Sequence, residues 1–92
     1  MQVVWKFPID RKTLQAVQMP KGASILSVGD QSGQLMLWAM VDPSNDIESQ
    51  VIEIAGTGLE LIDRPHREFI GTVFQWPYVW HVFKIPSTDI SF

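Results

Sequence analysis

The chain has 92 residues, of which 46% are hydrophobic, 11% are aromatic and 18% are charged. This length suits one domain and leaves no room for a second, and the apolar content is too high for a disordered chain. The net charge of -3, from seven basic and ten acidic residues, argues against binding to nucleic acid or an anionic membrane, since both need clustered positive charge. Cysteine is absent, which excludes disulfide bonds and thiolate chemistry.

Targeting signals are not evident in the sequence. The segment 1–8 has no basic region, no long apolar run and no small-residue cleavage site of the kind that signal peptides carry. The longest apolar run, at 35–41, has seven residues, whereas a helix needs about 20 to cross a bilayer. We therefore expect an intracellular protein that has no contact with a membrane.

Short apolar runs separated by glycine- and proline-containing turns predict an all-β domain. Seven such runs, rich in Val, Ile, Phe and Trp, occur in chain order at 2–7, 14–19, 23–29, 34–41, 48–55, 69–75 and 78–85. Asp30-Gln31-Ser32-Gly33 predicts a tight antiparallel hairpin. We expect a small antiparallel sandwich or partly open barrel of about six to seven strands over residues 1–86, with a C-terminal tail at 87–92.

Alternation within the runs predicts which side chains reach the core. In the run at 48–55, Glu53 lies between two isoleucines that face the core, so it is expected to face water. Trp5, Trp38 and Trp80 also alternate within their runs and are expected in the core.

The run at 34–41 is apolar on both faces. Only one face can line a single interior, so the other must be covered by a loop, by the tail or by a second copy of the chain. Leu59–Ile62 is the only apolar loop, and the tail offers Ile90 and Phe92. We favour the second copy, which predicts a homodimer with twofold symmetry.

The sequence assembles no catalytic or metal-binding constellation. His66 and His81 lie near no nucleophile motif, and His81 is expected to form hydrogen bonds at a sheet surface. Asp42, Ser44 and Asp46 have the spacing of a calcium loop, but the required glycine and the bidentate glutamate are missing, which favours an Asx turn. We therefore expect no enzymatic activity, no metal and no cofactor.

One set of residues is a candidate ligand site, although strand termination is the favoured explanation of its Gly-Thr-Gly segment and a solvated loop that of His66. A Gly-Thr-Gly segment follows a predicted strand, so its N–H groups can form an anion nest. The densest positive charge of the chain lies nearby, and two aromatic residues flank Pro77, where an exposed ring contacts a partner or covers the end of the barrel. The candidate ligand-binding residues are Gly56, Thr57, Gly58, Arg64, His66, Arg67, Trp76 and Tyr78.

Six segments, taken in order, form a recognisable pattern. They are Trp5-Lys6-Phe7-Pro8, residues 19–28, residues 37–43, Gly56-Thr57-Gly58, Phe69-Ile70-Gly71-Thr72 and Trp80-His81-Val82-Phe83. This pattern resembles that of a family of small, largely uncharacterised proteins encoded by bacteriophages and prophages. The resemblance implies a phage origin and a small β fold, and it implies no catalytic or binding residue.

Three functions fit these observations. The first is a non-enzymatic phage accessory protein that binds a host protein or complex in the bacterial cytoplasm, such as an antiviral-defence component, which the small size and acidic balance favour. The second is a protein that sequesters a phosphate-bearing small molecule such as a nucleotide signal, with the phosphate on the Gly-Thr-Gly segment and the arginines, and the base on a tip aromatic. The third is a minor virion or assembly component.

Overall fold

The computed structural model describes residues 1–90, which form seven strands and one short 3-10 helix. The elements are β1 (Val3–Pro8), β2 (Leu14–Pro20), β3 (Ser24–Gln31), β4 (Gln34–Val41), β5 (Ile47–Gly56), β6 (Glu68–Gln75), β7 (Tyr78–Ile85) and η1 (Ser87–Asp89). All seven predicted strands are confirmed, with ends that agree to within two residues. None of the described helices is long and apolar enough to cross a bilayer.

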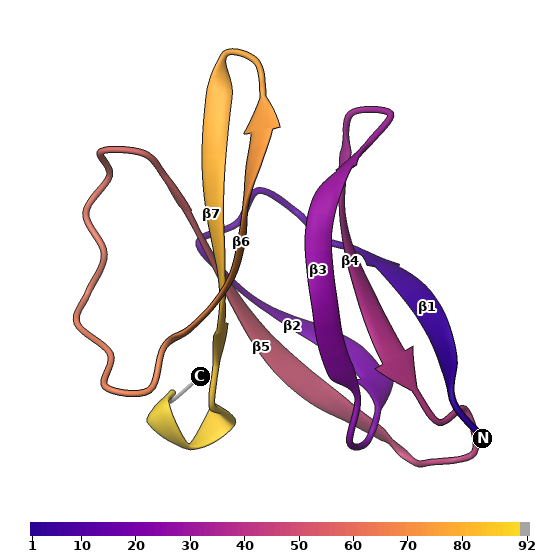
Figure 1. The fold of residues 1–92 in the computed structure, drawn as a ribbon. Helices are drawn as coiled ribbons and strands as arrows, with labels where there is room; N and C mark the ends of the chain where they lie inside the picture. The colour runs from indigo at the N-terminus through magenta and orange to yellow at the C-terminus, as the bar shows by residue number, and fades with distance from the viewer. Residues whose placement is uncertain (91–92) are drawn as a thin grey trace.

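The strands form two antiparallel sheets that pack as a sandwich, which confirms the predicted fold class (Figure 1). Sheet A has the order β1-β4-β3 and sheet B the order β2-β5-β7-β6. The predicted hairpin joins β3 to β4, and both turn residues, Ser32 and Gly33, have positive φ values of 51° and 87°. Two successive positive φ values are characteristic of a type I′ turn, whose backbone twist matches that of the two strands it joins.

The core lies between the inner faces of the two sheets. Strand β4 shows the alternation most clearly, because every second side chain is at most 2% exposed. These inner side chains are Leu35, Leu37, Ala39 and Val41. Sheet B contributes Ile52, Ile54 and Val82 to the same cluster.

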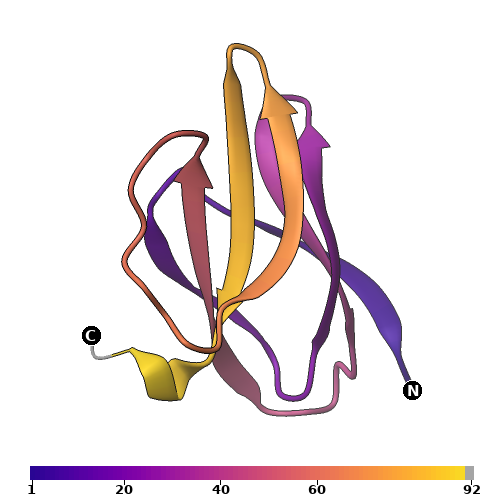
Figure 2. The ribbon, with the colours of Figure 1, turned by 60° about the vertical axis from the view of Figure 1, so that its left-hand side comes forward.

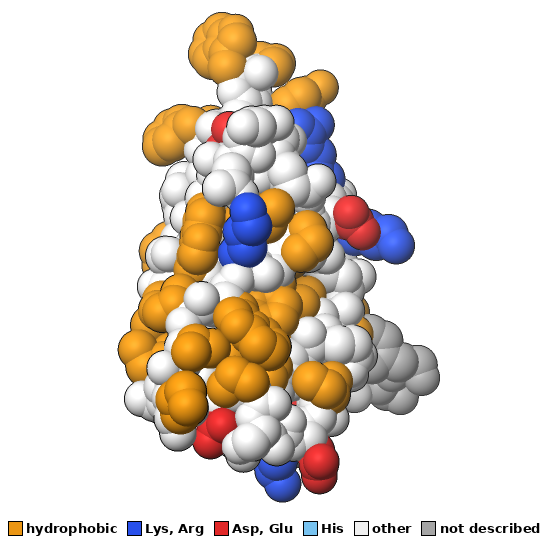
Figure 3. Space-filling view, turned by 90° about the vertical axis from the view of Figure 1, so that its right-hand side faces the viewer, with side chains coloured by type: hydrophobic (Ala, Val, Ile, Leu, Met, Phe, Trp, Pro, Cys, Tyr) orange, Lys and Arg blue, Asp and Glu red, His pale blue; other side chains and the backbone are white. Residues whose placement is uncertain are grey.

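The outer face of sheet A is apolar and only partly covered. It carries the other side chains of β4, which are half-buried, namely Met36, Trp38 and Met40. Val4 and Lys6 of β1 pair with β4 residues of this face, and the Lys6 ammonium donates a hydrogen bond to Gln31 Oε1 at 2.9 Å. Figure 3 shows the hydrophobic side chains gathered around a basic one on this side of the molecule.

Two of the three predicted covers for this face can be compared with the structure. The loop Leu59–Ile62 lies on the sheet B side of the sandwich, away from sheet A, so that alternative is wrong (Figure 1). The 3-10 helix η1 lies below sheet B (Figure 2), and Ile90 follows it directly, so Ile90 does not cover sheet A. Phe92 lies outside the described residues. A second copy of the chain stays a prediction.

The prediction that three tryptophans lie in the core is correct for Trp80, which packs against the core cluster. It is wrong for Trp38, because that ring lies on the outer face of sheet A, across Gly29. It is also wrong for Trp5, which is 41% exposed. Strand β1 is an edge strand, so no neighbouring strand covers one side of that ring.

The connection from β4 to β5 is the predicted Asx turn. Oδ1 of Asp42 accepts hydrogen bonds from the hydroxyl of Ser44 at 2.7 Å and from its backbone N–H at 3.0 Å. These two bonds stabilise the charged carboxylate, which lowers the pKa of Asp42 from its usual value.

Candidate functional site

The two arginines of the predicted site pair with Glu53 on the outer face of sheet B. Arg64 Nε lies 2.9 Å from Glu53 Oε2, and Arg67 Nε lies 2.6 Å from Glu53 Oε1. Glu53 is 1% exposed, so the prediction that it faces water is wrong. The reason is that the connection 57–67 folds back over β5 and brings its own charges to the carboxylate.

The ionic cluster of Glu53, Arg64 and Arg67 attaches the connection 57–67 to sheet B. Arg67 also donates to the carbonyl of Ile62 and lies over the ring of Phe83, 5.4 Å from its centroid. His66 extends the attachment, because its Nδ1 lies 3.1 Å from a carboxylate oxygen of Asp89 in η1. Arg64, Arg67 and His66 therefore attach the connection 57–67 to sheet B and to η1. The structure does not bring them to the Gly-Thr-Gly segment.

The aromatic residues of the predicted site lie at the tip of the β6–β7 hairpin, which projects beyond the rest of the sandwich (Figures 1 and 2). Trp76 is 96% exposed, Tyr78 is 51% exposed, and Phe74 just before the turn is 75% exposed. The hairpin therefore carries three large rings into solvent.

A cavity of about 360 Å³ lies between the turn of this hairpin and the end of β5. It brings together three of the predicted site residues, Gly56, Thr57 and Tyr78. Its other lining residues are Leu59, Pro77, Val79 and Trp80. Gly58 is not part of this lining and forms the turn beyond it, with a φ of 86°.

A buried glutamine organises the same end of the sandwich. Gln75 is 8% exposed, and its Oε1 accepts hydrogen bonds from Arg11 Nε at 3.1 Å and from Trp80 Nε1 at 3.0 Å. Its Nε2 donates to Asp30 Oδ1 at 2.7 Å and to the carbonyl of Gly33 at 3.2 Å. One amide thus joins β6, β7, the β3–β4 hairpin and the connection between β1 and β2.

Arg11 completes the arrangement by lying over two rings. Its guanidinium carbon is 5.5 Å from the ring centroid of Tyr78 and 5.6 Å from that of Trp80, and the two rings stack on each other. A second, smaller cavity of about 260 Å³ opens beside it, lined by Arg11, Asp30, Gly33, Gln75 and Trp76. We refer to Arg11, Gln75, Trp76, Tyr78 and Trp80 as the aromatic end.

Sequence reasoning missed Arg11 and Gln75. Arg11 lies between strands in a polar segment that carries no motif. Gln75 did carry a signal, because it occupies an inward position two residues after Val73, where alternation predicts an apolar side chain. A polar residue at such a position needs partners, and its partners are the residues of the aromatic end.

His81 forms hydrogen bonds at the outer surface of sheet B, as predicted. Its Nε2 lies 2.7 Å from Thr57 Oγ1, and its Nδ1 lies 3.0 Å from Thr72 Oγ1. Both ring nitrogens are thereby engaged by hydroxyl groups. Within residues 1–90, no group of three or more His, Asp or Glu side chains is arranged to hold a metal ion.

Comparison with known proteins gives one match. No curated protein and no solved structure matches the chain. A family model matches it over residues 1–90, which is nearly its whole length. The chain therefore belongs to the family described as "Domain of unknown function (DUF7352)".

Proposed function

We propose that this chain is a non-enzymatic phage accessory protein that binds a host protein in the bacterial cytoplasm, and that the aromatic end is its binding surface. The observation that carries the proposal is the Trp76 ring, which is 96% exposed at the tip of a projecting hairpin. Trp, Tyr and Arg dominate the energetics of protein interfaces. Trp76, Tyr78 and Arg11 supply one residue of each type at this end.

A protein partner fits this surface better than a phosphate-bearing small molecule. The cavity beside Tyr78 offers a ring for stacking, but its lining carries no charged side chain. The arginines that would bind a phosphate are paired with Glu53 instead. A nucleotide bound there would find no charged side chain in the cavity lining for its phosphate group.

Trp76→Ala is expected to weaken binding of the host protein by at least about 30-fold, because truncating a hot-spot tryptophan removes about 2 kcal/mol or more. Immobilised wild-type protein and the variant are exposed to bacterial lysate, and captured proteins are compared quantitatively. A protein that is enriched only by the wild type is then purified, and its Kd is measured by calorimetry. The variant should keep the wild-type melting temperature, since the ring is nearly free of contacts.

Trp5→Ala serves as the matched control, since it removes an exposed indole from strand β1, which does not belong to the aromatic end. The control should capture the same protein as the wild type. Equal capture by Trp76→Ala and wild type would contradict the proposal. A nucleotide that raises the melting temperature at about 100 times its Kd, where binding adds about 2.7 kcal/mol of stability, would instead favour the small-molecule alternative.

We also propose that the chain forms a homodimer through the outer face of sheet A, the face that carries Met36, Trp38 and Met40. A three-stranded face of this length spans roughly 350 Å² in projection, which is below the roughly 800 Å² per partner of a standard interface. We therefore expect a weak dimer that dissociates on dilution.

Light scattering over a concentration series is expected to give a mass that rises toward twice the 10.5 kDa of one chain at high protein concentration and falls toward 10.5 kDa on dilution. Met40→Glu places a charge on the face and should give the monomer mass. Phe69→Glu, at a site on β6 that is 59% exposed, should leave the mass unchanged. A wild-type mass of one chain at every concentration rules the dimer out.

A further inference from the structure

The edge strands β3 and β6 lie side by side without pairing. Strand β3 ends sheet A and β6 ends sheet B, and the contacts between them join the two sheets at this corner. The register of each strand with its own partner shifts near one end, between Ile25 and Ser27 in β3 and between Phe69 and Gly71 in β6. We call the space between 24–26 and 68–70 the seam.

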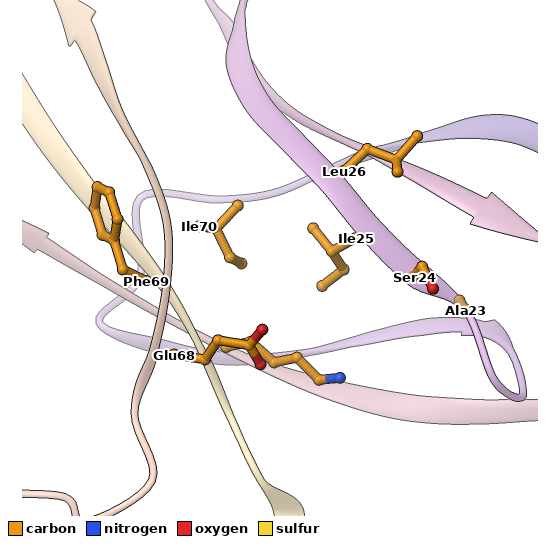
Figure 4. A pocket seen from close by; sticks show the side chains of 8 residues that line it. Ala23, Ser24, Ile25, Leu26, Glu68, Phe69 and Ile70 are labelled. Atoms are coloured by element: carbon orange, nitrogen blue, oxygen red, sulfur yellow. The ribbon is translucent and has the colours of Figure 1, made fainter.

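The seam contains a cavity of about 390 Å³. In Figure 4 the side chains of Ile25 and Ile70 lie in the space between the two strands, whereas Leu26 is directed away from it. A second cavity of about 330 Å³ shares Glu68 and Lys84 with the first. These two charged residues therefore border both cavities, and we refer to the first cavity as the groove.

Unpaired backbone groups border this groove. Strand β3 pairs only with β4, and β6 pairs only with β7. In the described residues, no turn or loop makes a backbone hydrogen bond to 24–26 or 68–70. Free edges of this kind present donors and acceptors at strand spacing, and an extended chain is the occupant that matches them.

The side chains of the groove define the chemistry of that chain. Ile25 and Ile70 are half-buried and apolar, so they favour an apolar side chain between them. Glu68 and Lys84 face each other in the strand register, yet neither forms an ion pair among the described residues. Each charge is therefore available to a charge of opposite sign on the occupant.

We propose that the seam binds an extended segment of a partner protein by β-strand addition to the free edge of β6. The segment places an apolar side chain between Ile25 and Ile70 and carries charged residues that meet Glu68 and Lys84. Main-chain hydrogen bonds supply affinity in this mode, and the alternating side chains supply specificity. This site is separate from the aromatic end and does not rest on its function.

A library of random twelve-residue peptides displayed on yeast, selected against the full chain, tests the proposal. Selected peptides are expected to share alternating apolar residues with a flanking charge. A synthetic peptide from the selection should bind Ile25→Lys at least ten times more weakly than wild type. It should bind Ile62→Lys as tightly as wild type, because Ile62 is 64% exposed in the connection 57–67 and lines neither cavity. Glu68→Lys provides a second variant at an exposed position, in case Ile25→Lys does not fold, and it should also weaken binding at least tenfold.

Amide hydrogen exchange on the complex gives an independent reading, since peptide addition should slow exchange at 68–70 and leave the hairpin tip unchanged. Peptides that bind Glu68→Lys and Ile25→Lys as tightly as wild type would overturn the proposal, as would a selection that yields no binder. Peptides whose binding depends on Trp76 alone would place the site at the aromatic end, which also overturns it. The proposal that the aromatic end binds a host protein is tested separately, by the capture experiment with Trp76→Ala, and its outcome does not depend on the peptide selection.

Discussion

Glu53→Gln is expected to lower the free energy of unfolding by about 3–5 kcal/mol, which is typical when one partner of a buried ion pair is removed. The substitution keeps the size of the side chain but takes away the charge that two arginines share. Arg64 and Arg67 are only 13% and 18% exposed, so both guanidinium groups would lose their counter-charge in a poorly hydrated site. Urea unfolding followed by tryptophan fluorescence measures the change.

Glu60→Gln is the matched control, because it removes the same charge from an exposed position of the same connection. It should change stability by no more than about 0.5 kcal/mol. Replacing all three charged residues together, as Glu53→Leu, Arg64→Met and Arg67→Leu, should recover most of the loss, since no unpaired charge remains. Equal urea midpoints for Glu53→Gln and Glu60→Gln would show that the cluster does not stabilise the fold.

Leu37→Ala is expected to cost about 2–5 kcal/mol, because the side chain is 0% exposed and its removal leaves a cavity between the sheets. Met36→Ala, one residue earlier on the same strand, should cost only about 1 kcal/mol, since that side chain is half-buried on the outer face. The pair of variants therefore measures the difference between the two faces of β4. Urea midpoints with an unchanged m-value report it.

The outcome for Met36 also bears on the homodimer. In a dimer the outer face is covered, so Met36→Ala would cost more at high protein concentration than at low concentration. A loss for Met36→Ala as large as that for Leu37→Ala in a strictly monomeric sample would contradict the assignment of the inner and outer faces.

The positions of the seven strands could be predicted from the sequence because two local signals agree. Side-chain alternation marks the strands, and Gly and Pro mark the turns between them. The order of the strands could not be predicted in this way. Strand β1 pairs with β4 and β2 with β5, and alternation alone does not distinguish these pairings from those between consecutive strands.

The candidate site was predicted only in part, for a related reason. Trp76 and Tyr78 flank a turn proline, which is a local signal, and both are exposed at the hairpin tip. Arg64 and Arg67 were interpreted from their proximity in sequence to Gly56. Their partner is Glu53, which the alternation of β5 assigns to water. Only the path of the connection 57–67 determines which group meets these charges.

The amide of Gln75 has a consequence for the binding surface that we propose at the aromatic end. It is bonded to Arg11, Asp30 and Trp80, which belong to separate segments of the chain. Segments tied together in this way lose little conformational freedom when a complex forms, which leaves more of the contact energy as affinity. The aromatic end is therefore preorganised in the free protein, and the proposed association there would require no folding step.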